Sequence, residues 1–294
     1  MEWIPAKTIL SGYVENNLWF GTNYNMNTYK GCNHGCIYCD SRSSCYGIDH
    51  FDQVRAKKNA LALLERELKA KRKRGVVGLG AMSDPYNPFE KEYCLTRGAL
   101  ERINRFGYGV AIATKSSLIE RDIDLLKDIS AHSPVLIKLT ITTADDVLCR
   151  KIEPNVSFSS QRFQTIRMLS QEGIFTGILL MPVLPFLEDT EKNIAKIINL
   201  AHKNEAKFIY PAFGVTLRQN QREWFYDKLD RLFPAMKDKY IKAYGNSYEC
   251  RSPNSESLWR VFKKNCDRYG LLYEMHDIVE AYKTPTQATQ LSLF

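Results

Sequence analysis

The chain has 294 residues, of which 44% are hydrophobic and 25% are charged, so it can form a sizeable globular core. No apolar run is long enough to span a membrane, and the first residues lack the basic and apolar regions of a signal peptide; we expect a cytoplasmic protein. The formal net charge of +8 favours a polyanionic partner such as nucleic acid, although many basic proteins simply carry solvated lysines.

Hydrophobic periodicity predicts helices and strands in regular alternation. The first predicted helix covers residues 51–74 and ends in the basic run 69–74, which is typical of a solvated helix terminus, with a phosphate contact as the alternative. Short apolar runs then predict strands at 76–81, 108–113, 135–141, 174–183 and 208–215. Amphipathic stretches between these runs predict helices at 95–105, 121–129, 160–171 and 191–203.

This alternation is typical of βαβ units and a parallel sheet. With one further strand expected before Cys32, about six βα units fit between residues 24 and 215, which predicts an α/β fold with a partial (βα)6 barrel. Aromatic-rich segments around Trp224 and Trp259 predict helices beyond the barrel. We therefore expect a core at 1–215 with a lead-in at 1–23, a helical C-terminal extension at 216–283 and a flexible tail at 284–294.

Three of the eight cysteines, Cys32, Cys36 and Cys39, fall within eight residues. In a chain of this size without a secretion signal, reduced thiols or a metal centre are favoured over a disulfide framework. Three thiolates at this spacing can bind three irons of a cubane cluster and leave the fourth open, while Gly31 and Gly35 allow the backbone to turn tightly beneath it. A zinc site completed by His34 and three unrelated core cysteines are the alternatives.

The pattern Cys-x3-Cys-x-aromatic-Cys at the start of a partial (βα)6 barrel resembles the radical S-adenosylmethionine (SAM) superfamily. The resemblance implies an enzyme that binds a [4Fe-4S] cluster through Cys32, Cys36 and Cys39 and binds SAM at the open iron. In that family an electron from the reduced cluster cleaves SAM to a 5′-deoxyadenosyl radical, which abstracts a hydrogen atom from the substrate. It also implies an electron donor such as flavodoxin or ferredoxin.

Further segments resemble a narrower group, the spore photoproduct lyase-like proteins that are often labelled DNA repair photolyases. These segments are residues 27–39, 83–88, 114–116, 150–154 and 181–185. The resemblance implies the SAM contacts: Ser83 and Asp84 for the amino group, Lys115 and Thr140 for the carboxylate and ribose, and Tyr38 beside the adenine. For Ser83 and Asp84 the alternative is an ordinary Asp-Pro turn, and for Lys115 and Thr140 it is a polar strand end that faces solvent. Arg150 and Glu153 are expected to form either an ion pair or a substrate contact.

The resemblance to the lyase itself breaks down at two positions. The authentic lyase returns a hydrogen atom through a cysteine just before its Ser-Asp pair, assisted by a tyrosine directly after the third cluster cysteine. The matching positions here are Ala81 and Asp40. Splitting of the spore-type thymine dimer is therefore not expected unless Cys45 or Cys94 reaches the site, and we expect both of these cysteines to be buried core residues.

The last five residues, Gln290, Leu291, Ser292, Leu293 and Phe294, resemble the pentapeptide by which bacterial replication and repair proteins bind the sliding clamp. The alternative is a tail that folds back onto its own domain. Together with the charge and the lyase-like segments, the tail favours an enzyme that acts on DNA. Radical modification of RNA, peptide or a small molecule, and a non-enzymatic interaction protein with a structural metal centre, are the competing functions.

Overall fold

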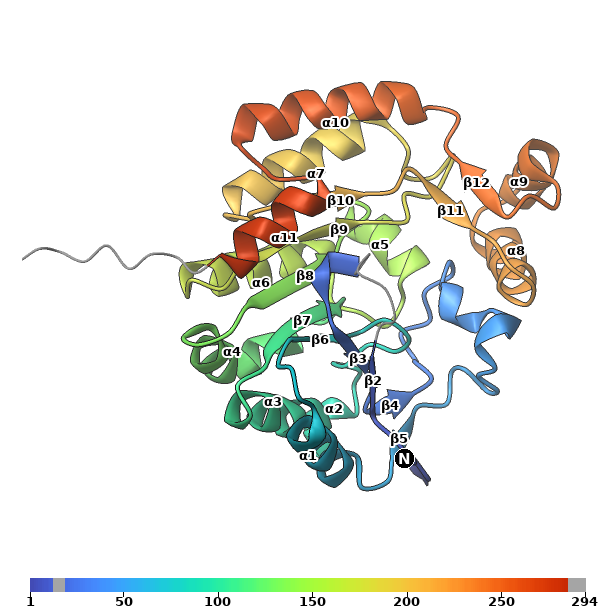
Figure 1. Ribbon diagram of the computed structural model, residues 1–294. Helices are drawn as coiled ribbons and strands as arrows, with labels where there is room; N and C mark the ends of the chain where they lie inside the picture. Colours follow the sequence, from blue (N-terminus) through green and yellow to red (C-terminus); the bar gives the residue numbers. More distant parts are fainter. Residues whose placement is uncertain (13–18, 285–294) are drawn as a thin grey trace, which may run out of the picture.

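The computed structural model describes residues 1–12 and 19–284. Its main sheet has the strand order β10-β9-β8-β7-β6-β3-β2, in which only the β2–β3 pair is antiparallel (Figure 1). The strands are β2 (Leu10–Gly12), β3 (Tyr24–Met26), β6 (Val76–Leu79), β7 (Gly109–Thr114), β8 (Val135–Thr140), β9 (Thr176–Leu180) and β10 (Ile209–Pro211). The parallel strands from β3 to β10 confirm the predicted partial barrel of six units.

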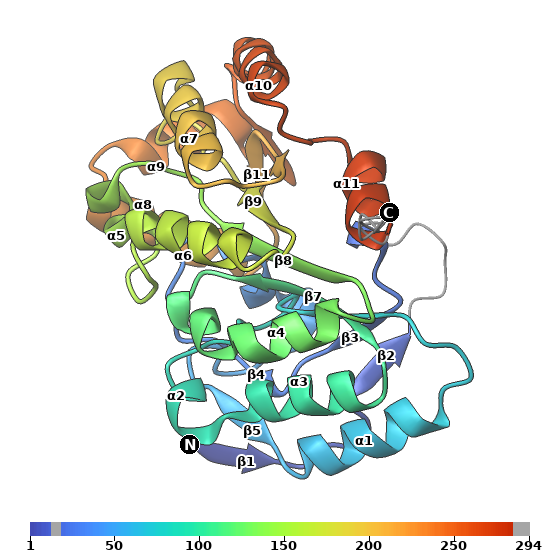
Figure 2. The same cartoon turned by 90° about the vertical axis from the view of Figure 1, so that its left-hand side faces the viewer.

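The helices of the barrel cover the outer face of this sheet, as Figure 2 shows for α1, α3, α4 and α6. They are α1 (Ala60–Ala70), α2 (Glu90–Tyr93), α3 (Leu95–Arg105), α4 (Ile123–Ser130), α5 (Asp146–Ile152), α6 (Ser159–Gln171) and α7 (Glu191–Lys203). In β8, Ile137 and Leu139 pack in the core that the helices share, whereas Leu136 packs with residues of the barrel interior. The strands are buried on both faces, which explains their nearly continuous apolar sequences.

The C-terminal segment returns to the barrel and covers it in two places. It contains β11 (Gly214–Thr216), α8 (Gln221–Leu232), α9 (Met236–Tyr244), β12 (Glu249–Arg251), α10 (Ser255–Tyr269) and α11 (Met275–Lys283). Helix α10 packs along α7, and α11 contacts β8 through a cluster in which Ile278 and Tyr282 meet Leu136. Two predicted helices are confirmed here, α8 and α10. The boundary at residue 215 stays a prediction, and β11 lies across it.

The predicted helix over residues 51–74 is wrong at both of its ends. Its first part contains β5 (Arg55–Lys57), which forms a second sheet with β1 (Glu2–Ile4) and β4 (Tyr29–Lys30). Val54 and Ala56 are buried while Arg55 between them is half-exposed, a period of two that favours a strand. The exposed basic residues 71–74 follow α1 and precede the amino end of β6.

The predicted strand over residues 208–215 is also wrong in part, because it is divided between two sheets. β10 belongs to the barrel, whereas β11 pairs antiparallel with β12. Gly214 adopts a φ of 152°, and the carbonyl oxygen of Cys250 on β12 lies 2.7 Å from where a Cβ of residue 214 would be. Such a close approach needs glycine, and Gly214 therefore lets β11 pair with β12 just after the last bonds to the barrel sheet at Ala212.

Lys138 of β8 is buried in the barrel interior, and replacing it tests whether a neutral lysine lies there. Its side chain is 3% exposed, its ammonium nitrogen lies 4.6 Å from the Phe20 ring centroid, and burial lowers the pKa of Lys138 to about 7. Between pH 7 and the ordinary pKa of 10.5, the unfolded chain binds a proton that the native chain lacks, so this group makes stability rise with pH. We expect Lys138→Met to raise the free energy of unfolding at pH 7 by about 2–4 kcal/mol.

The measurement is urea unfolding of both proteins across pH 7–10. The difference in the free energy of unfolding between Lys138→Met and the wild type should shrink as the pH approaches 10. Other titrating groups contribute equally to the two proteins and cancel in this difference. Parallel stability profiles would contradict a neutral lysine in the barrel interior.

Candidate active site

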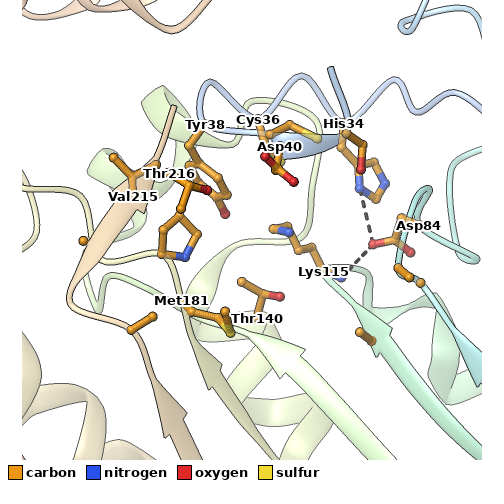
Figure 3. A pocket seen from close by; sticks show the side chains of 18 of the residues that line it. His34, Cys36, Tyr38, Asp40, Asp84, Lys115, Thr140, Met181, Val215 and Thr216 are labelled. Atoms are coloured by element: carbon orange, nitrogen blue, oxygen red, sulfur yellow. Dashed lines mark hydrogen bonds and ion pairs between the residues drawn. The ribbon is translucent and has the colours of Figure 1, made fainter. Parts of the chain in front are cut away.

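A cavity of about 630 Å³ lies at the carboxyl ends of the parallel strands, where the sites of such barrels are found (Figure 3). The cysteine loop forms one side, the carboxyl ends of β6 to β10 and the residues after them form the floor, and β11, β12 and α10 form a further wall. Every residue that the sequence assigned to the cofactors lines it: Cys32, Cys36, Tyr38, Cys39, Ser83, Asp84, Lys115 and Thr140. Folding thus brings together residues that the sequence separates widely.

The cysteine loop is held at its base by pairing of β4 with β5 and by a 2.8 Å hydrogen bond from the Cys32 amide to the Phe51 carbonyl oxygen. Gly31 and Gly35 have φ angles of 80° and 72°. A Cβ on Gly31 would lie 2.7 Å from the carbonyl oxygens of both Phe51 and Gln53. The predicted need for glycine is therefore confirmed, and at Gly31 it has both a conformational and a steric cause.

Gly31→Ala should displace Cys32, because two backbone oxygens occupy the space of the added methyl group and cannot move aside as a side chain could. We expect a destabilisation of about 1–3 kcal/mol and reduced iron binding after anaerobic reconstitution. Gly47→Ala is the matched control: Gly47 has a φ of 58° in the same loop, with nothing within 4 Å of its added Cβ. Equal iron binding by the two variants would contradict the steric argument.

The three thiols line one cavity, an arrangement that is compatible with a cubane cluster. All three are free, Cys32 and Cys36 are buried, and burial raises the pKa of Cys32 to about 12 and raises the pKa values of the other two. Within residues 1–12 and 19–284, no three His, Cys, Asp or Glu side chains converge closely enough to hold one metal ion. In a cubane each thiolate binds a different iron, so separated thiols around one cavity are what it requires.

His34 does not complete a zinc site with these cysteines. Its Nδ1 lies 3.4 Å from the Asp84 carboxylate, which ties the cysteine loop to the segment after β6. Asp84 also accepts hydrogen bonds from the Thr114 hydroxyl at 2.7 Å and from the Lys115 amide at 2.8 Å. Asp84 therefore connects three segments of the cavity. The Ser83 hydroxyl donates to the Tyr29 carbonyl oxygen at 3.1 Å, so the assignment of both residues to the SAM amino group stays a prediction.

Lys115 supplies a buried positive charge to the cavity, and its ammonium nitrogen lies 5.6 Å from the Tyr38 ring centroid (Figure 3). Burial acts to lower the pKa of Lys115, but the neighbouring Cys36, Glu153 and Asp84 outweigh it, so the pKa is raised and the group is charged. Thr140 ends β8 and lies near it on the cavity floor. A cation beside a hydroxyl can bind a carboxylate and a ribose, and that assignment also remains a prediction.

Glu153 forms a buried ion pair, but with Arg162 rather than with Arg150. Both side chains are almost fully buried, and Glu153 also accepts a hydrogen bond from the Tyr38 hydroxyl. Burial acts to raise the pKa of Glu153, but the charges of Arg162 and Lys115 outweigh it and lower the pKa. Arg162 donates to the Thr140 carbonyl oxygen as well, so this pair fixes two cavity residues from behind. Arg150 donates instead to the Pro154 carbonyl oxygen.

Neither Cys45 nor Cys94, the two candidate hydrogen donors, lines the cavity. Cys45 is exposed, which contradicts the predicted core position, and its Sγ lies 3.0 Å from Arg218 Nη1. Cys94 is half-buried, and its Sγ lies 3.6 Å from Arg121 Nη1. Cys250 does line the cavity, but its Sγ lies 3.8 Å from the Ser247 carbonyl oxygen, in the cluster behind β12. Ala81 and Asp40 are both in the lining.

The C-terminal segment contributes a wall of the cavity that the sequence does not predict. It consists of β11, β12 and the first turns of α10, with Thr216, Glu249, Arg251 and Trp259 in the lining. No local pattern marks these residues, because their common location depends on the pairing of β11 with β12. Figure 3 shows Thr216 on the side of the cavity occupied by Tyr38.

A family model described as the Radical SAM superfamily matches residues 26–201. An uncharacterised protein of Mycobacterium tuberculosis (strain ATCC 25618 / H37Rv) is 29% identical over 228 residues, covering 75% of this chain and 67% of that protein. An uncharacterised protein of Methanocaldococcus jannaschii is 33% identical over 174 residues, covering 58% of this chain and 64% of that protein.

Two solved structures share the fold. Spore photoproduct lyase complexed with dinucleoside spore photoproduct is similar with a TM-score of 0.65, covering 91% of this chain and 79% of that chain at 12% identity. The methyltransferase TsrM from Kitasatospora setae, with cobalamin and a [4Fe-4S] cluster bound, has a TM-score of 0.55, covering 81% and 52% at 11% identity. In the part of the chain that the structure describes, no helix is long and apolar enough to cross a membrane.

Proposed function

The chain belongs to the radical SAM superfamily, and on this premise we propose that it is an enzyme whose radical chemistry acts on DNA in a repair-related role. The observation that carries the assignment to this cavity is the presence of three separated thiols and the predicted SAM contacts in one lining. The net charge of +8 and the fold shared with a lyase solved with a dinucleoside photoproduct support DNA as the substrate.

The cofactors of this family are a [4Fe-4S] cluster and SAM, and when bound, the cluster supplies the electron that cleaves SAM to the adenosyl radical. Cys32, Cys36 and Cys39 would hold the cluster. The charged Lys115 would orient the methionyl carboxylate of SAM, and Thr140 would bind the ribose. Asp84 holds the backbone of Lys115 through a hydrogen bond to its amide.

The test is SAM cleavage by the reconstituted, anaerobically reduced protein with and without DNA. We expect undamaged duplex to have little effect and duplex that carries the cognate lesion to stimulate cleavage, because binding energy from the substrate would complete the site. Absence of DNA binding and of stimulation by every lesion in a panel would overturn the proposed substrate. Stimulation by RNA, peptide or a metabolite instead would favour the competing radical SAM functions.

We propose that this enzyme does not split the spore-type thymine dimer. Ala81 and Asp40, which stand where the lyase has its hydrogen-return residues, cannot donate a hydrogen atom to a carbon radical as a thiol can. Incubation with the dinucleoside spore photoproduct, SAM and reductant should therefore yield no thymidine monomers in amounts above the protein-free control. Catalytic formation of these monomers would refute this part of the proposal.

Two partners complete the proposal. The family requires an external one-electron donor, for which flavodoxin or ferredoxin is proposed. The clamp-binding peptide, residues 290–294, lies outside the residues that the structure describes. Deletion of residues 290–294 should abolish binding to purified sliding clamp while SAM cleavage continues, and unchanged clamp affinity would remove this partner.

A further inference from the structure

We propose that β11, β12 and the start of α10 form a nucleotide-recognition wall, in which Arg251 binds a phosphate and Trp259 stacks on the base. The inference rests on the proposed action on DNA and names the residues that would read the substrate. The wall is separate from the predicted cluster and SAM residues, which lie on the cysteine loop and at the carboxyl ends of β6 to β8.

The side chain of Arg251 is available to bind a phosphate at the cavity. It is exposed, lines the cavity, and forms no ion pair with any residue in 1–12 or 19–284. Its backbone is fixed, because Arg251 pairs with Gly214 in the sheet and its carbonyl oxygen accepts a 2.8 Å hydrogen bond from the Tyr244 hydroxyl. A guanidinium group on a fixed strand can bind a phosphate through two parallel hydrogen bonds.

Trp259 supplies an aromatic ring to the same cavity lining as Arg251. Its ring meets Phe213 at 5.5 Å and 85° and meets Phe262 at 5.5 Å and 90°, both edge to face. Trp259 is half-buried, and both Trp259 and Phe213 line the cavity. Two edge contacts hold the indole in one orientation, and stacking of a base on such a ring contributes about 1–3 kcal/mol.

The size of the cavity restricts how DNA could enter. A volume of about 630 Å³ has to hold SAM as well as the substrate, so a stacked duplex cannot be accommodated. The substrate would be a nucleotide turned out of the stack, as other enzymes that act on bases require. An aromatic ring for the base and an arginine for its phosphate are the groups that such a nucleotide needs.

The experiment measures binding of a fluorescein-labelled single-stranded DNA oligonucleotide to the full-length, reconstituted protein by fluorescence anisotropy. We expect Arg251→Ala to weaken binding about 10-fold and to lower the salt slope by about 0.7, the value for one phosphate contact in single strands. Arg260→Ala is the matched control, because Arg260 is an exposed arginine on α10, next to Trp259 in sequence, that lies outside the cavity lining; it should bind DNA like the wild type.

Trp259→Leu should weaken binding about 5- to 100-fold, whereas Trp259→Phe should retain most of the affinity, which separates stacking from a general folding defect. If the wild type binds DNA but Arg251→Ala and Trp259→Leu bind it equally well, the proposed role of the wall is refuted. The proposal that DNA is the substrate is then retained. If the wild type binds no DNA, or binds RNA of the same sequence more tightly, the proposed substrate falls and the inference falls with it.

Discussion

Replacing Cys32, Cys36 or Cys39 by alanine is expected to abolish both the iron-sulfur chromophore and SAM cleavage. Each thiol would bind a different iron, so the loss of one thiol leaves one iron without its protein ligand. A cluster left with two protein ligands cannot be retained through reconstitution and gel filtration. Iron and sulfide content, the absorption spectrum and SAM cleavage should all fall to the level of the unreconstituted protein.

Cys45→Ala is the control for these three variants. Cys45 lies in the same loop but is exposed, and it is outside the lining of the cavity. We expect its iron content and SAM cleavage to match those of the wild type. Full iron and sulfide content in all three cysteine variants would contradict the assignment of the cluster to this loop, and with it the position of the active site.

Arg162→Met should destabilise the fold more than Gly31→Ala does. The change leaves the Glu153 carboxylate buried without its cation, since both side chains are almost fully inaccessible to water. Breaking a buried pair in this way costs about 3–5 kcal/mol. It also removes the hydrogen bond to the Thr140 carbonyl oxygen, so the cavity floor should lose order together with the fold. Urea unfolding measures the loss.

The double variant Arg162→Met with Glu153→Gln distinguishes the effect of an unpaired buried carboxylate from the effect of lost side-chain packing. If the uncompensated carboxylate causes the loss, neutralising it should recover about 1–3 kcal/mol of the stability of Arg162→Met. Glu153→Gln by itself leaves Arg162 as an unpaired buried cation and should also be destabilising. Additive effects of the two substitutions would show that the pair does not interact and would contradict the arrangement at the back of the cavity.

Predictions from periodicity were most accurate where a segment has a single buried face. The predicted helices 95–105 and 191–203 coincide with α3 and α7 because their apolar residues recur with the helical period. Accuracy was lowest where long-range pairing decides the structure. Nothing local indicates that Arg55–Lys57 pair with the N-terminal strand β1, and charged residues on both sides of Ala56 resemble a continuation of the helix.

Some features of the candidate site could likewise be predicted from the sequence, and others depend on long-range packing. The location of Asp84 and Lys115 in the cavity could be predicted from the sequence, because residues at the carboxyl ends of parallel strands meet at one edge of the sheet. The partner of Glu153 could not, since Arg150 and Arg162 are both near it in sequence and only the packing of α5 on α6 selects Arg162. Position along the chain thus identified candidates for the site, while side-chain packing decided their roles.

By itself, the sequence determined the loop that carries the three cysteines, the type of barrel and the order of its units, because each depends on spacing and periodicity over short stretches of chain. Only the tertiary structure decided which residues of the C-terminal segment join the cysteine loop in lining the cavity. Gly214 and Arg251 become neighbours through the pairing of β11 with β12, and Trp259 is held by Phe213, which precedes it by several elements. Contacts between such distant segments depend on the packed core as a whole, so no local pattern encodes them.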